Sequence, residues 1–119
     1  MNDNTGIDPA ALVRLDRIGG HGFVRKMIDL FLEEAPERLA AARQGGQTGD
    51  HTAVSAAAHS IKSSAHNFGA TNLALIAQKI EVSARAGNVE NLPALLNELE
   101  QTYSAAKSWL ETQRDALPT

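Results

Sequence analysis

Apolar residues recur every three or four positions along most of the chain, which is the spacing of an amphipathic α-helix. The pattern predicts a short helix from Asp8 to about Ile18, which Gly19-Gly20 ends. A second helix is expected from about Gly22 to Gln44. Pro36 lies inside this segment and is expected to kink or break it, because proline has no backbone N–H to donate to the preceding turn.

Three further helices complete the pattern. Asp50 is a natural N-cap for a helix that ends near Asn67-Phe68, where Gly69 suits the left-handed position after the last turn. A helix over about 70–86 follows, and Gly87-Asn88 stop it. The final helix begins near Leu92 and has the most regular apolar stripe, formed by Leu92, Leu95, Leu96, Leu99, Tyr103, Ala106 and Leu110.

These segments indicate an all-α fold. No segment alternates strictly between apolar and polar residues, so no strand is expected. Long amphipathic helices with short connections favour an antiparallel up-and-down four-helix bundle, with an additional short N-terminal helix as a cap. We expect residues 1–7 to form a flexible N-terminal tail and residues 8–117 to form the helical-bundle domain.

Composition narrows the classes of function. The chain has 119 residues, which is the size of one domain, and it has no cysteine, which excludes disulfides and thiol chemistry. The net charge is −3 and the 11 Lys and Arg residues are scattered, so nucleic-acid binding is not expected. No apolar run approaches the roughly 20 residues that span a bilayer, and the start of the chain lacks the pattern of a signal peptide. We expect a soluble, cytoplasmic monomer without membrane contact.

His59 is the residue with the most promising chemistry. On a helical wheel it lies roughly 150° from the middle of the apolar stripe of its helix, and Lys62 lies one turn further on. Its exposed face also carries short side chains, namely those of Thr52, Ser55, Ala56 and Ser63, together with His66. The wheel alone favours a surface histidine that has no function.

The run from Ala58 to Ala70 changes this interpretation. A histidine is followed by an aliphatic residue two positions later, a lysine three positions later, small residues, and a Gly-Ala pair ten and eleven positions later. These residues are His59, Ile61, Lys62, Ser63, Ser64, Ala65, Gly69 and Ala70. In this pattern the chain resembles the histidine phosphotransfer (HPt) domains of two-component phosphorelays. The family usually has glycine where this chain has Ser63, and serine adds a hydroxymethyl group near the docking face.

The resemblance implies a phosphocarrier and not a self-sufficient enzyme. His59 would accept a phosphoryl group on Nε2 from the aspartate of a receiver domain, in a hybrid sensor kinase for example, and pass it to the aspartate of a response regulator. Lys62 would support the phosphoryl group electrostatically, and Glu81 could hydrogen-bond to the ring. No intrinsic cofactor is implied, and Mg²⁺ would be held by the receiver domain. The partner-binding surface would comprise Ser55, Ala56, Ser63 and His66.

Two other hypotheses remain open at this stage. The chain could be a helical adaptor that is never phosphorylated, in which case His59→Gln would keep full activity. It could also be a helical metal protein or enzyme, but His59 and His66 are separated by a helical rise of about 10 Å, too far to share one ion. We therefore expect no metal site. The acidic residues Asp29, Glu33, Glu34 and Glu37 are interpreted as a solvated helix face.

Overall fold

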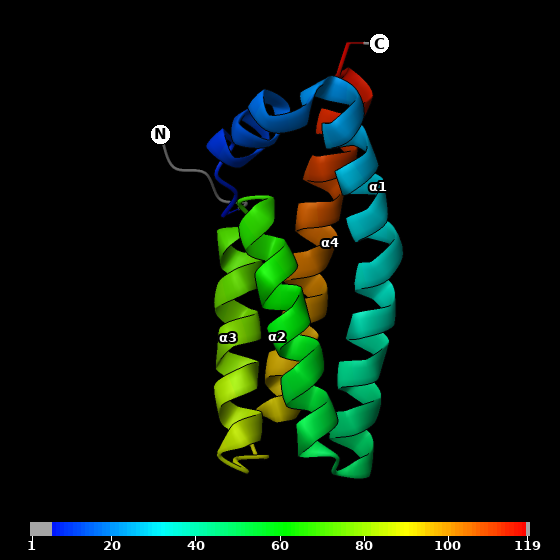
Figure 1. Ribbon diagram of the computed structural model, residues 1–119. Coiled ribbons are helices and arrows are strands. Elements are labelled where there is room, and N and C mark those ends of the chain that lie inside the picture. The colour runs from blue at the N-terminus through cyan, green and yellow to red at the C-terminus, as the bar shows by residue number, and fades with distance from the viewer. Residues whose placement is uncertain (1–5, 119) are drawn as a thin grey trace.

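The computed structural model describes residues 6–118, which form four helices in a bundle (Figure 1). Helix α1 comprises Ala10–Thr48, α2 His51–Asn67, α3 Thr71–Arg85 and α4 Leu92–Ala116. Consecutive helices pack against each other in alternating directions, and α4 returns to pack against α1. The expected all-α, up-and-down bundle is confirmed. In residues 6–118 the β-type pairing is a single isolated antiparallel bridge between Ile7 and Ala70.

Helix α1 consists of two helical segments that meet at Gly20. The backbone there has φ 83° and ψ −179°, which is far from helical and accessible mainly to glycine. The segment before Gly20 turns across one end of the bundle (Figure 1), as expected of the short N-terminal helix. The sequence therefore placed the break between the first two helices correctly.

Two details of α1 differ from the sequence-based prediction. Pro36 does not interrupt the helix. The non-helical dihedral angles within α1 are those of Gly20, and the backbone at Pro36 stays helical. The fixed φ of proline is compatible with a helix, and burial of Ala35 and Leu39 on either side holds the segment against the core. The helix also continues beyond Gln44 to Thr48, and Gly49 ends it in a left-handed conformation.

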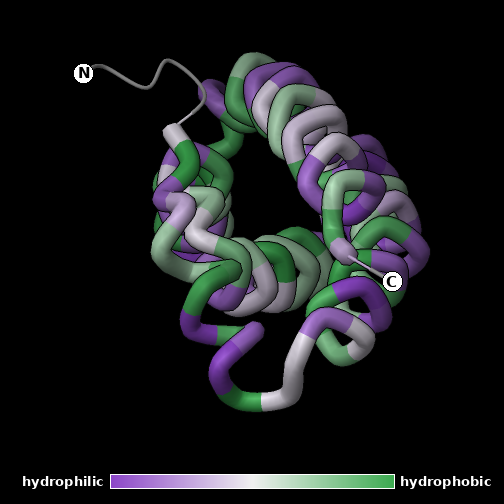
Figure 2. Tube along the Cα trace, turned by 90° about the horizontal axis from the view of Figure 1, so that it is seen from above, coloured by the Kyte–Doolittle hydropathy of each residue, from purple (hydrophilic) through white to green (hydrophobic). Residues whose placement is uncertain are grey.

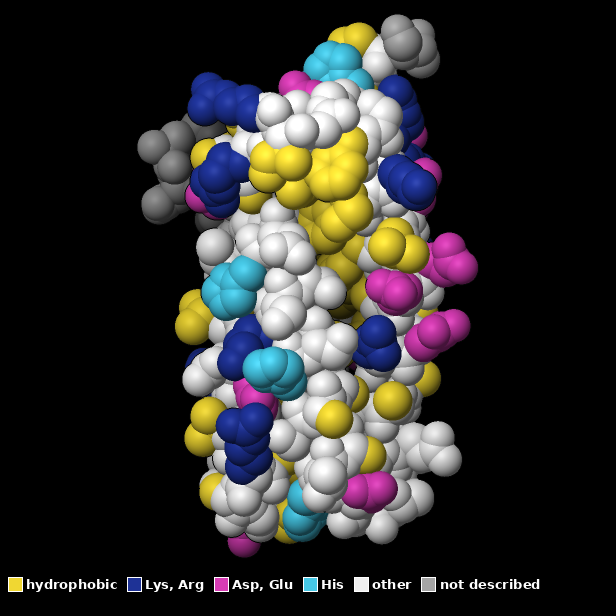
Figure 3. All heavy atoms as spheres, in the orientation of Figure 1, with side chains coloured by type: hydrophobic (Ala, Val, Ile, Leu, Met, Phe, Trp, Pro, Cys, Tyr) yellow, Lys and Arg dark blue, Asp and Glu magenta, His cyan; other side chains and the backbone are white. Residues whose placement is uncertain are grey.

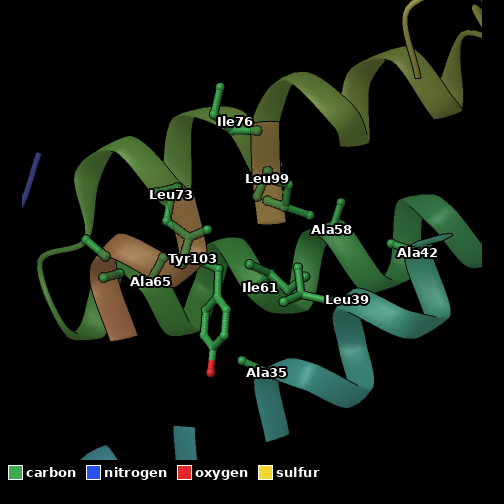
Figure 4. Close-up of a cluster of buried hydrophobic side chains, with 14 of the residues drawn as sticks. Ala35, Leu39, Ala42, Ala58, Ile61, Ala65, Leu73, Ile76, Leu99 and Tyr103 are labelled. Carbon is green, nitrogen blue, oxygen red and sulfur yellow. The ribbon is translucent and has the colours of Figure 1, made fainter. Parts of the chain in front are cut away.

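The core is formed by apolar side chains from all four helices. Figure 4 shows Ile61, Leu73, Leu99 and Tyr103 pointing into one shared interior, and Figure 2 shows hydrophobic and hydrophilic positions on opposite sides of the same helices. The predicted stripe of α4 is buried at every position except Leu95, which is partly buried. Within residues 6–118, no helix has both the length and the hydrophobicity required to cross a membrane.

The N-terminal segment is attached to the connection between α2 and α3. Ile7 is only 4% exposed, and the Asp8 backbone N–H donates to the Gly69 carbonyl at 2.7 Å. Ile7 was expected in the flexible tail, but its aliphatic side chain is part of the core, and its backbone forms a bridge with Ala70. Residues 1–5 of that expected tail lie outside the described residues.

Gly69→Ala is expected to destabilise the domain by about 2–4 kcal/mol. Gly69 has φ +69°, and a Cβ there would lie 2.4 Å from the Asp8 carbonyl oxygen. Gly87→Ala is the matched control, because Gly87 has φ +71° but no described neighbour within 4 Å of a new Cβ. Gly87→Ala should lower the free energy of unfolding by about 1 kcal/mol, because backbone strain is its only expected effect. Urea unfolding measures both, and equal losses would contradict a contribution from the close contact with Asp8.

Candidate functional site

His59 lies on the outer face of α2, where its side chain is 57% exposed. Asp50 caps the N-terminus of the helix, because its side chain accepts a hydrogen bond from the Ala53 backbone N–H at 3.0 Å. On the opposite face, Ala58 and Ile61 are buried in the core and fix the rotation of the helix. The imidazole is therefore presented to solvent from a rigid element.

Glu81 of α3 is the buried centre of the site. Its side chain is only 4% exposed, and its two oxygens meet three nitrogen-bearing side chains. Oε2 lies 2.9 Å from His59 Nδ1 and 2.8 Å from Arg85 Nη2. Oε1 accepts a hydrogen bond from Lys62 Nζ at 2.7 Å. The hydrogen bond between Glu81 and the His59 ring that the family resemblance suggested is thus present in the structure.

The charge of Glu81 determines which ring nitrogen of His59 carries the proton. The Lys62 ammonium, with further contributions from His59 and Arg85, holds the pKa of Glu81 below its ordinary value of 4.5, although burial acts in the opposite direction. At neutral pH Glu81 is therefore a carboxylate, which can only accept hydrogen bonds. Nδ1 of His59 must be the donor, so Nε2 of the neutral ring carries the free lone pair.

Arg85, Gln78 and Ser55 take part in the same network. Arg85 Nε donates to Ser55 Oγ at 3.2 Å, and Lys62 Nζ donates to Gln78 Oε1 at 3.0 Å. The sequence analysis did not select Arg85 or Gln78. Arg85 follows Glu81 by four positions, a spacing that places opposite charges side by side on a helix and could have identified it.

The four residues expected to form the partner-binding surface are not equivalent. Ala56, Ser63 and His66 are exposed, in agreement with the helical wheel. Ser55 is buried at 9% exposure, because α3 covers it and the Arg85 side chain lies over its hydroxyl. Ser55 accepts a hydrogen bond from Arg85 and lines the groove beside His59, and its direct contact with a partner stays a prediction.

An open groove runs beside His59 between α2 and α3. Its volume is about 670 Å³, and it is lined by His51, Thr52, Ser55, Ala56, His59, Ala84, Arg85 and Gly87. Figure 3 shows histidine, lysine and arginine side chains in a row over α2 and α3, around one acidic side chain, whereas basic and acidic side chains are mixed over α1. The groove therefore joins the candidate nucleophile to the guanidinium of Arg85.

Comparisons with known proteins agree with this geometry. Residues 26–109 match the sequence profile of the Hpt domain family. The crystal structure of histidine-containing phosphotransfer protein B (HptB) from Pseudomonas aeruginosa PAO1 is similar, with a TM-score of 0.90 and 27% sequence identity. The similarity covers 98% of this chain and 100% of that one. Comparison with curated protein sequences found no match.

Proposed function

This chain belongs to the Hpt domain family, and on that premise we propose that His59 is the residue that carries the phosphoryl group. The role of the chain is phosphoryl transfer in a phosphorelay, as a phosphocarrier. Four histidines occur in the sequence, so the family alone does not select the acceptor. The contact of His59 Nδ1 with the buried Glu81 carboxylate is the observation that supports our choice.

The Glu81 contact prepares His59 for nucleophilic attack. Because Nδ1–H donates to the carboxylate, the lone pair of Nε2 is available for attack. Nε2 attacks the phosphorus of an aspartyl phosphate, the bond from phosphorus to the aspartate oxygen breaks, and the aspartate leaves as a carboxylate. The N–P bond formed on His59 leaves Nδ1 protonated, and the resulting positive charge on the ring faces Glu81. Transfer to a second aspartate is the reverse of this step.

The partners in this proposal are receiver domains, in a hybrid sensor kinase or a response regulator. The chain supplies the nucleophile and a docking surface around it, and the receiver domain supplies the phosphorylated aspartate together with the Mg²⁺ ion bound beside it. The exposed imidazole on a face that carries the short side chains of Ala56 and Ser63 supports this arrangement, because the partner's loops can approach closely. Lys62 lies one turn from His59 and offsets negative charge on the transferred group.

A transfer assay with phosphorylated receiver domains tests the proposal. Receiver domains carrying a labelled aspartyl phosphate are mixed with the purified protein, and the labelled residue is located by mass spectrometry at alkaline pH. We expect label on His59 that is labile in acid and stable in alkali, as a phosphohistidine is. Label on another histidine would overturn the assignment of His59, and no label from a broad panel of receivers would favour an adaptor without phosphoryl transfer.

Ser63→Trp is expected to slow transfer from a receiver domain by about tenfold, equivalent to about 1.4 kcal/mol in the barrier. Ser63 is exposed and lies one turn beyond His59, so a large indole would obstruct a docking partner without entering the core. Ser104→Trp, at an exposed position of α4, is the matched control and should leave transfer unchanged. Equal rates for the two variants would show that the docking surface does not include Ser63.

A further inference from the structure

We propose that Arg85 binds the phosphoryl group on His59, from the groove between α2 and α3. The inference rests on the proposed function of His59 and adds to it a second cation that contacts the transferred group directly. Arg85 extends from the last turn of α3 and its side chain is 67% exposed. Its guanidinium thus lies at the surface that an incoming phosphoryl group must reach.

Arg85 and His59 are held at the same oxygen atom. Glu81 Oε2 contacts both His59 Nδ1, at 2.9 Å, and Arg85 Nη2, at 2.8 Å, so these two nitrogens are no farther apart than the two contacts laid end to end. The two side chains also line the same groove. Arg85 is held on the side of Ser55, one turn before His59, whereas Lys62 lies one turn after it. The two cations therefore flank the imidazole along α2.

The count of hydrogen-bond donors favours Arg85 over Lys62 as the principal phosphoryl ligand. A guanidinium has five N–H groups, and within residues 6–118 Arg85 uses one on Ser55 and one on Glu81. Lys62 has three N–H groups, of which Glu81 and Gln78 take two, and its side chain is only 21% exposed. Arg85 therefore has more donors to offer, in the planar arrangement that suits phosphate oxygens.

The formal charges also balance only with Arg85 present. Before phosphorylation the cluster has one carboxylate, Glu81, and two cations, Lys62 and Arg85, beside the His59 imidazole. A dianionic phosphoryl group on Nε2, with the ring cationic, makes the phosphorylated cluster neutral. Without Arg85 the same cluster would carry a net negative charge at a buried carboxylate, which is unfavourable. Arg85 is thus expected to stabilise the phosphorylated state.

Phosphorylation by phosphoramidate tests the inference without a protein partner. Nε2 of His59 attacks the phosphorus of N-protonated phosphoramidate, the P–N bond breaks, and neutral ammonia leaves with the three protons that its nitrogen already carries. Arg85→Gln is expected to lower the rate by about fivefold, a moderate effect because the guanidinium is exposed. Lys79→Gln removes the same charge from α3 at a residue outside the Glu81 network and should stay within about twofold of the unmodified protein. Arg85→Lys should recover part of the rate.

A spectroscopic readout separates phosphoryl binding from a structural role. The Arg85 Nε–H signal in a ¹H–¹⁵N spectrum is expected to shift on phosphorylation, and not to shift when His59→Gln protein is treated in the same way. An unmoved signal, or equal rates for Arg85→Gln and Lys79→Gln, would overturn the inference. Absence of phosphorylation at His59 in the unmodified protein would instead contradict the proposed function, so the two failures are distinguishable.

Discussion

Replacement of His59 by glutamine is expected to abolish phosphoryl acceptance from every receiver domain, a loss of at least about a thousandfold. Glutamine retains polarity and approximate size but has no nucleophilic nitrogen lone pair, because its amide nitrogen is conjugated with the carbonyl. The His59 side chain is 57% exposed, so its removal should change the free energy of unfolding by no more than about 1 kcal/mol. The loss of transfer would therefore reflect chemistry and not unfolding.

His66→Gln is the informative comparison for this experiment. His66 is also exposed and lies on the same helix, seven residues after His59. It lies outside the Glu81 network, so protein carrying His66→Gln should still be labelled at His59. Rates are measured as label transferred from the same phosphorylated receiver to each protein. Loss of label in His66→Gln with retention in His59→Gln would reverse the assignment of the acceptor.

Glu81→Leu is expected to lower both stability and transfer. The substitution removes the anion that Lys62 and Arg85 share, and it leaves His59 Nδ1 without its hydrogen-bond acceptor. We expect a loss of about 1–3 kcal/mol at pH 7, less than for a fully buried pair because both cations can reach solvent. Transfer should fall by about tenfold, since the proton is no longer confined to Nδ1. Glu81→Gln retains an acceptor oxygen and should preserve most of the transfer rate.

The stability difference caused by Glu81→Leu should depend on pH. The pKa of Glu81 in the folded state lies below its ordinary value of 4.5, mainly because of the Lys62 hydrogen bond, so the charged form is favoured by folding. The contribution of Glu81 is therefore fully present above about pH 5 and is lost as the pH falls through the lowered pKa. Urea unfolding from pH 7 to pH 3 measures this. Glu90→Gln, at an exposed position, is the control. A stability difference between Glu81→Leu and the unmodified protein that stays constant down to pH 3 would contradict a stabilising role of the Glu81 charge.

Much of the fold was predictable because its signals are local. Helix boundaries at Asp50 and Gly69 depend on capping and on a left-handed turn, and both can be identified from a few neighbouring residues. The expected break at Pro36 and the expected helix end at about Gln44 were wrong because both depend on tertiary packing. A Cβ on Gly45 would lie 2.9 Å from Val54 Cγ2, so this glycine allows α1 and α2 to approach closely while α1 continues through it to Thr48.

Part of the site was also predictable, because some of its residues form a local pattern. The pattern around His59 and Lys62 lies on one helix and can be identified from the sequence. Glu81 was a candidate by family resemblance, yet its burial and its three nitrogen contacts depend on how α3 packs against α2. The hydrogen bond between Arg85 and Ser55 forms only through this packing, since the two residues belong to different helices. No pattern within a single helix could therefore have joined them.

The short connection between α2 and α3 means that the site is assembled locally. His59 and Glu81 are separated by 22 positions in the chain, and residues 68–70 alone link the two helices. The entropy lost in closing such a small loop is low compared with that of a contact between distant segments. The hairpin of α2 and α3 thus contains the nucleophile, the carboxylate and both cations. Helices α1 and α4 complete the core beneath it, and their sequences can diverge without altering the order of the chemical groups.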